Sequence, residues 1–421
     1  MSKLGPLKVA FIHPDLGIGG AERLVVDAAI GLQSRGHAVT MFTSHHDPSH
    51  SFQETHDGSL TVRVHGDWLP RTTFGKGHMI CALLRGIFLA LSLLVANREE
   101  QYDVVFADQL SVYNPLVRFT EAKAVVNSNF TAGVFRDAFK RIKFVPKVLY
   151  PGINFDLYNN KVDEGDERVK PLISKKRFLL SINRFERKKN VALAVHAFAT
   201  LRDIAPKEFA DLRLVIAGGY DKRVSENVDH LRELDELASG LNIETYTLFP
   251  TSAAPPESAK IIFLPSFTEA QRTYLLANAV CLIYTPSGEH FGIVPVEAMH
   301  AKLPVIAVNS GGPKETVVDG VTGYLLPPDP DAFAAKIGQL LKDEDRRKEM
   351  GLRGLAHVKA KFSLDAFVDQ LEDILGGLME MKRPPMWKVL ARCALLVGFV
   401  VPLFYFMLVQ LTAEMKKGKQ E

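Results

Sequence analysis

The chain contains two successive series in which apolar strand-like runs alternate with amphipathic helix-like runs. These two series limit the folds available to it. The first series begins with the apolar run 9–12, a glycine-rich turn and a helix-like segment that ends at Gly36. A polar, charge-rich stretch at 156–176 interrupts the pattern, which restarts at Phe178. Successive strand–helix–strand units build parallel sheets covered by helices. We therefore predict an α/β chain with two Rossmann-like domains.

The domain bounds follow from where the alternation stops and restarts. We expect a first domain at residues 1–150, a linker at 151–176 and a second domain at 177–380 that ends in a terminal helix crossing between the domains. The strands expected in the second domain are 178–182, 212–217, 261–265, 280–284 and 304–308. Because ligands bind at the carboxyl ends of parallel strands, we place the functional site in a cleft that the two domains face.

Composition excludes several classes of protein. Of 421 residues, 47% are apolar and 24% charged, which is typical of globular proteins and not of collagen-like or disordered chains. A net charge of +3 is too small for a protein that coats nucleic acid, so no nucleic-acid partner is expected. Cys81, Cys281 and Cys393 lie far apart without a Cys/His cluster, which argues against a disulfide framework and a structural zinc site.

Two apolar runs are candidates for contact with a lipid bilayer. Residues 393–411 contain no charge, and 19 residues at about 1.5 Å each nearly span a bilayer core of roughly 30 Å. We predict a transmembrane or re-entrant segment at 386–412; the alternative is the terminal core helix of a soluble protein. The second run, 79–96, is interrupted by Arg85 and fits a membrane-surface helix as well as a core helix.

Two glutamates in segment 287–307 form the strongest candidate site. Glu289 follows a predicted strand, and Glu297 lies inside the helix that begins near Gly292. A helix N-terminus presents free N–H groups and a positive dipole end to a phosphate or a hydroxyl. Carboxylates accept paired hydrogen bonds from vicinal hydroxyls, so Glu297 fits a ribose and Glu289 a hexose. The alternative is that one glutamate caps the helix and the other forms a surface salt bridge.

A cluster of cations opens the second domain, directly after its first predicted strand. The cluster consists of Arg184, Arg187, Lys188 and Lys189. Cations at a strand-to-helix turn compensate a diphosphate, and arginine binds its oxygens in pairs. A solvated run of charge is the alternative. The position at the carboxyl end of a strand favours phosphate binding.

Four segments in fixed order resemble glycosyltransferase family 4, whose members have the GT-B fold. They are HPDLGIGGAERLV at 13–25, SINRFERKKN at 181–190, GGYDKRVSEN at 218–227 and EHFGIVPVE at 289–297. The resemblance covers nearly the whole chain, including the apolar tail. It is greatest to the eukaryotic members that extend the dolichol-linked oligosaccharide at the endoplasmic reticulum.

The resemblance implies a retaining mannosyltransferase that adds α-1,3- and α-1,6-linked mannose. The donor would be GDP-mannose and the acceptor a dolichyl-diphosphate oligosaccharide that carries a single mannose. The enzyme would lie at the endoplasmic reticulum membrane with its catalytic domains facing the cytosol, beside other mannosyltransferases of the same pathway. The family needs no metal and no cofactor. The implied catalytic residues are Glu289, Arg184 and Lys189, and the implied donor-binding residues are Gly19, Gly20, Phe291, Gly292, Ile293, Val294 and Glu297.

The chain departs from the family near residues 118–123. Members of the family have several dozen further residues there, including a strand beside the sugar site, so the first domain is expected to be shortened. Two alternatives therefore stay open: a non-catalytic nucleotide-sugar-binding or scaffold homologue, and a UDP-sugar-dependent transferase of the same fold. The residues alone do not distinguish guanine from uracil.

Overall fold

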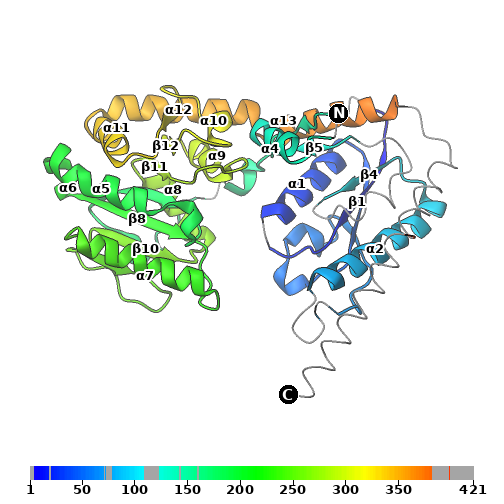
Figure 1. Ribbon diagram of the computed structural model, residues 1–421, viewed down its shortest axis with the longest axis horizontal. Coiled ribbons are helices and arrows are strands. Elements are labelled where there is room, and N and C mark those ends of the chain that lie inside the picture. The colour runs from blue at the N-terminus through cyan, green and yellow to red at the C-terminus, as the bar shows by residue number, and fades with distance from the viewer. Residues whose placement is uncertain are drawn as a thin grey trace, which may run out of the picture. The chain divides into compact units, whose positions relative to one another are not determined.

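The computed structural model describes residues 4–18, 20–70, 72, 78–108, 123–141, 144–158, 161–381 and 398. The chain divides into two compact units (Figure 1). Unit 1 is Met1–Ala124 with Val368–Glu421, and unit 2 is Val125–Phe367. This division groups residues 125–150 with unit 2, whereas the domain bounds expected from the sequence stay a prediction. The predicted shortening near 118–123 and the predicted membrane segment at 386–412 lie outside the described residues, apart from Lys123 and Gly398.

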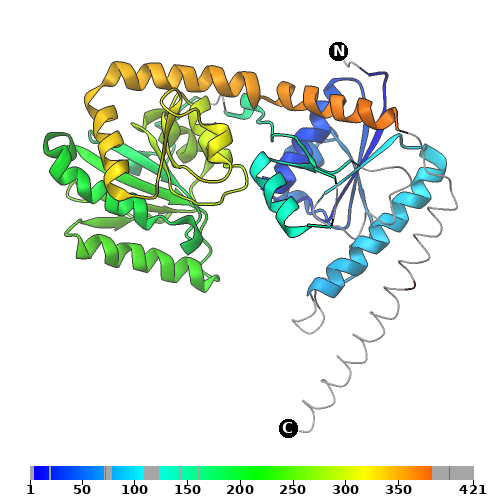
Figure 2. The ribbon, with the colours of Figure 1, turned by 45° about the horizontal axis from the view of Figure 1, so that its top comes forward.

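Unit 1 is built on a parallel sheet in the order β3-β2-β1-β4. Its strands are β1 (Lys8–His13), β2 (Ala38–Thr43), β3 (Thr61–Val64) and β4 (Val104–Ala107). Its helices are α1 (Gly20–Ser34), α2 (His78–Glu100) and the 3-10 turns η1 (Pro48–His50) and η2 (Gln53–Thr55). Figures 1 and 2 show α1 and α2 on opposite sides of this sheet. The first predicted strand–helix–strand unit is confirmed.

Helix α2 contains the second apolar run and buries one face in unit 1. Its Leu89, Ala90 and Leu93 pack against Ala10 and Ile12 of β1. The core-helix interpretation of run 79–96 is therefore confirmed for this face. The other face exposes Met79, Leu91 and Val95. By length and hydropathy, Cys81–Glu100 is the single helix in the described ranges that could cross a membrane, a criterion that core helices of soluble proteins also meet.

Helix α13 (Leu364–Met379) carries the chain from unit 2 back to unit 1. Within unit 1, its buried Glu372 lies 3.0 Å from Nε2 of buried His37, between α1 and β2. The backbone N–H of Leu7 donates to Nδ1 of the same ring at 3.1 Å. Since Nδ1 accepts a hydrogen bond, the proton of the neutral ring lies on Nε2 and points at the carboxylate.

Unit 2 contains a seven-stranded parallel sheet in the order β13-β12-β11-β7-β8-β10-β9. The strands are β7 (Arg177–Ile182), β8 (Leu212–Gly218), β9 (Thr245–Thr247), β10 (Ile261–Pro265), β11 (Leu282–Tyr284), β12 (Val305–Val308) and β13 (Gly323–Leu326). The five predicted strands are confirmed; β9 and β13 were not foreseen. A separate two-stranded sheet pairs β5 (Val125–Val126) with β6 (Lys147–Val148).

Helices cover both faces of this sheet (Figures 1 and 2). They are α5 (Ala192–Ile204), α6 (Pro206–Ala210), α7 (Ser225–Gly240), α8 (Glu269–Asn278), α9 (Ile293–His300), α10 (Pro313–Thr316), α11 (Pro330–Lys342) and α12 (Glu344–Lys361). Helix α4 (Asn129–Ala138) packs on the two-stranded sheet of β5 and β6 instead. The 3-10 turns are η3 (Phe155–Tyr158), η4 (Lys170–Leu172) and η5 (Arg187–Lys189). Every residue of β8 is buried: Leu214 and Ile216 join one core, and Val215 and Ala217 join the other. Burial on both faces explains the nearly continuous apolar strands of this domain.

Candidate active site

The strand order of unit 2 reverses between β7 and β11. From β7 the chain continues to β8 on one side, and from β11 it continues to β12 on the other. The two segments that leave the carboxyl ends of β7 and β11, 183–190 and 285–292, therefore start at a topological switch point, where open α/β sheets bind ligands. Both predicted site segments belong to this edge of the sheet.

Lys189 and Glu289, predicted to be catalytic, form an ion pair there. Lys189 Nζ lies 2.5 Å from Glu289 Oε2, and both side chains are mostly buried. The hydroxyl of Thr285 donates to the backbone oxygen of Lys189 at 2.8 Å, which fixes the two segments to each other. Glu289 therefore pairs with a cation of the site itself and does not form the surface salt bridge that was the alternative.

The four cations of segment 181–190 do not converge on one point. Arg184 and Lys188 share Glu186, with N–O distances of 3.1 and 3.0 Å. Arg187 binds Glu233 on α7 at 2.5 Å, so its guanidinium is engaged outside the site. The four cations thus have separate partners here, and the binding of a diphosphate by this cluster stays a prediction. Arg184 remains 63% exposed and available to a ligand.

The loop that carries Glu289 is shaped by glycines. Gly292 adopts a left-handed conformation with φ +80° as the residue before α9, which confirms a helix start near Gly292. The backbone N–H of Gly312 donates to Glu289 O at 2.6 Å. A Cβ on Gly312 would lie 2.3 Å from Phe291 Cα, so only glycine permits this approach. Ile293 and Val294 form the first turn of α9, while the Phe291 side chain is buried.

Glu297 is buried in α9 and has two partners that the sequence did not reveal. The Tyr158 hydroxyl donates to Glu297 Oε1 at 2.8 Å, and Arg272 Nη1 lies 3.2 Å from the same oxygen. The Arg272 guanidinium also stacks 4.3 Å from the centre of the Tyr158 ring. Burial raises the pKa of Glu297, while the charge of Arg272 opposes the rise. Neither a helix cap nor a surface salt bridge describes this residue.

In unit 1, Gly20 begins α1, and Gly19 lies outside the described residues. The nearby carboxyl end of β1 carries His13, which is 1% exposed. Its ring nitrogens lie 3.6 Å from Glu22 and 3.4 Å from Asp108. The donor contacts assigned to Gly19 and Gly20 stay a prediction.

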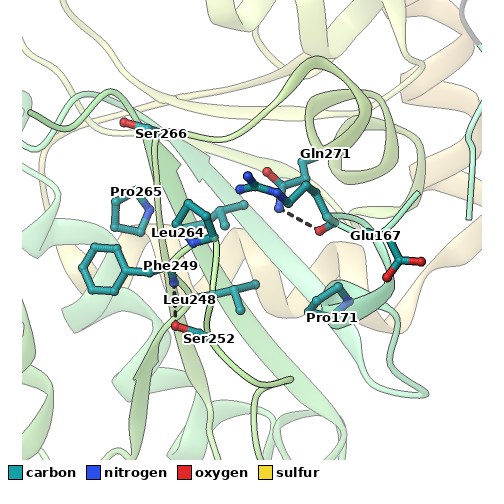
Figure 3. Close-up of a pocket in the computed structure, with 11 residues that line it drawn as sticks. Glu167, Pro171, Leu248, Phe249, Ser252, Leu264, Pro265, Ser266 and Gln271 are labelled. Atoms are coloured by element: carbon teal, nitrogen blue, oxygen red, sulfur yellow. Dashed lines mark hydrogen bonds between the residues drawn. The ribbon is translucent and has the colours of Figure 1, made fainter. Parts of the chain in front are cut away.

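A small pocket of unit 2 lies apart from these residues (Figure 3). It sits at the end of β10 beside Pro265 and Ser266, and the N–H of Phe249 donates to Ser252 Oγ at 3.0 Å. Its volume of about 20 Å³ holds roughly one water molecule, too little for a nucleotide. Across the described ranges, no group of three or more His, Cys, Asp or Glu is arranged to hold a metal ion.

Comparison with known proteins agrees with this geometry. Residues 163–356 match the family model of glycosyl transferases group 1, and residues 18–115 match that of glycosyltransferase family 4. The structure resembles a glycosyltransferase from Rickettsia africae, with a TM-score of 0.69, 18% identity and coverage of 90% of this chain and 100% of that one. Anabaena HepE in complex with UDP and glucose gives a TM-score of 0.65 at 18% identity, over 88% of this chain and 100% of that one. The chain is a glycosyltransferase of the GT-B fold.

Relatives of higher identity define the family more narrowly. Alpha-1,3/1,6-mannosyltransferase ALG2 of Rhizomucor pusillus is 51% identical over 416 residues, 88% of this chain and 91% of that protein. The Homo sapiens protein of the same name is 40% identical over 409 residues, 86% of this chain and 94% of that protein. The chain therefore belongs to the ALG2 family of alpha-1,3/1,6-mannosyltransferases, and the resemblance seen in its motifs is confirmed.

Proposed function

We propose that this chain transfers mannose from GDP-mannose, with retention of configuration, to a dolichyl-diphosphate oligosaccharide, making α-1,3 and α-1,6 linkages. The observation that carries the proposal is the Lys189–Glu289 ion pair at the switch point of unit 2, in a chain of this family. In this proposal Lys189 binds a phosphate and Glu289 binds the sugar, side by side. A nucleoside diphosphate sugar presents both groups together, because its β-phosphate is joined to the sugar through the anomeric oxygen.

In this proposal the bound donor separates Lys189 from Glu289 and takes the place of each residue's partner. The diphosphate binds Lys189 and Arg184, and Glu289, released from Lys189, accepts hydrogen bonds from mannose hydroxyls. The first turn of α9, at Ile293 and Val294, directs its N–H groups and dipole at the developing negative charge. The acceptor hydroxyl attacks the face from which GDP departs, and a phosphate oxygen of GDP takes its proton.

The ribose is assigned to Glu297. Tyr158 and Arg272 fix one of its oxygens, which orients the carboxylate before the nucleotide arrives. We assign no metal to the site, because Arg184, Lys189 and the helix end supply the positive charge that a metal supplies in other transferases. The base contacts that select guanine are left to experiment.

A membrane anchor is part of the same proposal. We propose that segment 386–412 anchors the chain in the endoplasmic reticulum membrane, with the catalytic units in the cytosol beside other mannosyltransferases of lipid-linked oligosaccharide synthesis. An epitope placed after Glu421 tests this. If the segment crosses fully, sealed microsomes protect the epitope from protease; if it is re-entrant, protease removes it. Recovery of the full chain in the soluble fraction would contradict the anchor.

The transfer itself is tested with membranes that contain this chain. GDP-mannose and a lipid-linked acceptor with a single mannose should give products that are one and two mannoses larger. Lys189→Ala should lower the rate by about 10² or more, as expected when a preorganised contact to the transition state is removed. The control is Lys207→Ala, on the exposed surface of α6. Wild-type transfer by Lys189→Ala would refute the phosphate assignment.

The same experiment separates the alternatives. A chain that binds GDP-mannose without forming a larger product is a nucleotide-sugar-binding or scaffold homologue, as a shortened first domain would allow. Transfer from a UDP-sugar offered in parallel, with none from GDP-mannose, would establish the other donor class.

A further inference from the structure

The N-terminus of α4 is attached to the loop that carries Glu289. Ser128, the buried residue that caps α4, donates its hydroxyl proton to the backbone oxygen of His290. Thr131, one turn further on, places Oγ1 at 2.9 Å from His290 Nδ1. The ring of Phe130 packs edge-on against the His290 imidazole at 5.9 Å. Three positions around the helix start, Ser128, Phe130 and Thr131, therefore contact the residue next to Glu289.

Glu315 of α10 holds the same helix end from the other side. Its carboxylate accepts hydrogen bonds from the backbone N–H of Asn129 at 2.9 Å and of Phe130 at 2.8 Å. The Asn129 side-chain amide and the Tyr150 hydroxyl also donate to it, at 2.8 and 2.9 Å. Four hydrogen bonds to one charged carboxylate make this a strong attachment for a half-buried side chain.

Glu315 also belongs to the turn that supports the loop directly. It follows Gly311 and Gly312 by a few residues, and Gly312 N–H donates to Glu289 O at 2.6 Å. A Cβ on Gly311 would come within 2.4 Å of the same oxygen. Each of three segments therefore contacts the other two: the Glu289 loop, the Gly311–Gly312 turn and the start of α4. Glu315 makes the contact between the Gly311–Gly312 turn and the start of α4.

The shortest hydroxyl contacts assign the tautomer of His290. The Ser128 proton goes to the His290 carbonyl, and the Thr131 proton goes to Asn127 Oδ1 at 2.6 Å, which is shorter than the 2.9 Å contact between Thr131 and Ser128. With both hydroxyl protons assigned in this way, Nδ1–H of His290 is the donor to Thr131. The neutral ring then presents Nε2 as a hydrogen-bond acceptor, on an exposed side chain next to Glu289.

Glu315 does more than cap helix α4. Ser128 Oγ accepts from the Thr131 N–H at 3.0 Å, and Glu315 accepts from the two preceding N–H groups, those of Asn129 and Phe130. In doing so Glu315 joins segments about 185 positions apart in the sequence, both of which contact the Glu289 loop. The contacts of Glu315 therefore fix the position of the Glu289 loop.

We propose that Glu315 is a positioning residue for sugar transfer: it holds α4 against the Glu289 loop and thereby keeps His290 with Nε2 available to a substrate hydroxyl. This inference rests on the proposed function, because the substrate hydroxyl belongs to that reaction. Glu315 does not contact substrate itself. It acts through Ser128 and Thr131 on His290.

The test compares Glu315→Gln with two other variants. Glu315→Gln turns an amide N–H₂ or a weaker acceptor toward the α4 N–H groups, so kcat should fall about 10- to 100-fold, the cost of a misplacement near 1 Å. KM for GDP-mannose and the affinity for GDP should stay within about threefold, because Arg184, Lys189 and Glu297 are untouched. Tyr150→Phe removes one donor and leaves both backbone bonds, so its loss should be less than about threefold. Glu349→Gln, on the exposed face of α12, is the matched control.

A double-mutant cycle separates positioning from general destabilisation. If Glu315 acts through His290, adding Glu315→Gln to His290→Ala should cost less than about twofold. An equal loss in both backgrounds, or an unchanged kcat in Glu315→Gln, would overturn the inference.

A second measurement does not depend on activity. The full-length protein is labelled with ¹⁵N-histidine, and the His290 resonances are identified as the pair that His290→Ala removes. In the wild-type protein they should show Nδ1 protonated and Nε2 without a proton. Glu315→Gln should give a mixture of the two tautomers. Protonation at Nε2 in the wild-type protein would overturn the inference. If the wild-type protein shows the expected tautomer but transfers no mannose, the proposed function fails and the positioning of His290 stands.

Discussion

Replacing Gly218 by alanine should disable the cation segment while leaving the sheet folded. Gly218 ends β8, and a Cβ built there lies 1.6 Å from the carbonyl oxygen of Asn183 and 2.5 Å from its carbonyl carbon. Since real Cβ contacts do not fall below 3.0 Å, the Asn183 carbonyl must move by about 1.4 Å, the difference between 3.0 and 1.6 Å. Arg184 follows directly and moves with it.

The size of that movement sets the expected loss. A displacement above about 1 Å in a positioning segment costs about 10² in kcat/KM. Overpacking of this kind destabilises by about 1–3 kcal/mol, which corresponds to roughly 2–12 °C in Tm for a unit of this size. We expect kcat/KM for GDP-mannose to fall about 100-fold, with a cooperative thermal transition retained.

The assay measures mannosyl transfer from GDP-mannose and thermal unfolding on the same preparations. The control is Gly240→Ala at the end of α7, where a Cβ meets nothing within 4 Å. That variant should keep wild-type activity and gain up to about 1 kcal/mol from the lower entropy of its unfolded chain. Wild-type kcat/KM in Gly218→Ala would show that the Asn183–Arg184 backbone does not set the donor geometry.

Three further predictions concern other parts of the molecule. Cys281 is fully buried, and burial raises the pKa of its thiol to about 12, so iodoacetamide near pH 8 should leave it unmodified in the native protein; mass spectrometry detects any adduct. Glu372→Ala removes the buried carboxylate paired with the His37 ring and should destabilise unit 1 by about 1–3 kcal/mol in denaturant unfolding, and an unchanged transition would contradict the pairing. Burial tends to raise the pKa of Glu315, but the N–H groups of Asn129 and Phe130 outweigh it and hold the pKa below its usual 4.5. Its stabilisation is therefore complete above pH 4.5 and lost as pH falls through the lower folded pKa, so the Tm advantage of wild type over Glu315→Gln should shrink below about pH 4.5.

The apolar pattern of the sequence was sufficient to predict the central strands of the sheet in unit 2 but not its edge strands. Strands such as β8 are buried on both faces, and their continuous apolar runs have few other interpretations. Strand β9, Thr245–Thr247, is three residues long, half-buried and at the edge of its sheet. It carries too few apolar residues to stand out from a loop.

For the candidate site too, residues within local motifs could be predicted from the sequence, and their distant partners could not. The sequence placed both site segments after strands, but their meeting at the switch point, where Lys189 pairs with Glu289, came only from the strand order of the folded sheet. The partners of Glu297 were missed because Tyr158 and Arg272 lie 139 and 25 positions away and belong to no motif. Glu186, which holds Arg184, and Glu315, which holds α4, read as ordinary surface acids in the sequence. Their roles depend on three-dimensional packing that no local pattern encodes.

The Lys189–Glu289 pair has a consequence for how the proposed cycle turns over. A ligand that offers only phosphate, such as GDP or inorganic phosphate, takes Lys189 and leaves a largely buried carboxylate without its counterion. The intact donor avoids this cost, because its sugar hydroxyls satisfy Glu289. Once mannose has moved to the acceptor, Glu289 regains its attraction for Lys189 and competes with the spent nucleotide for it. In the proposed cycle, the attraction between Lys189 and Glu289 therefore favours release of GDP and weakens product inhibition.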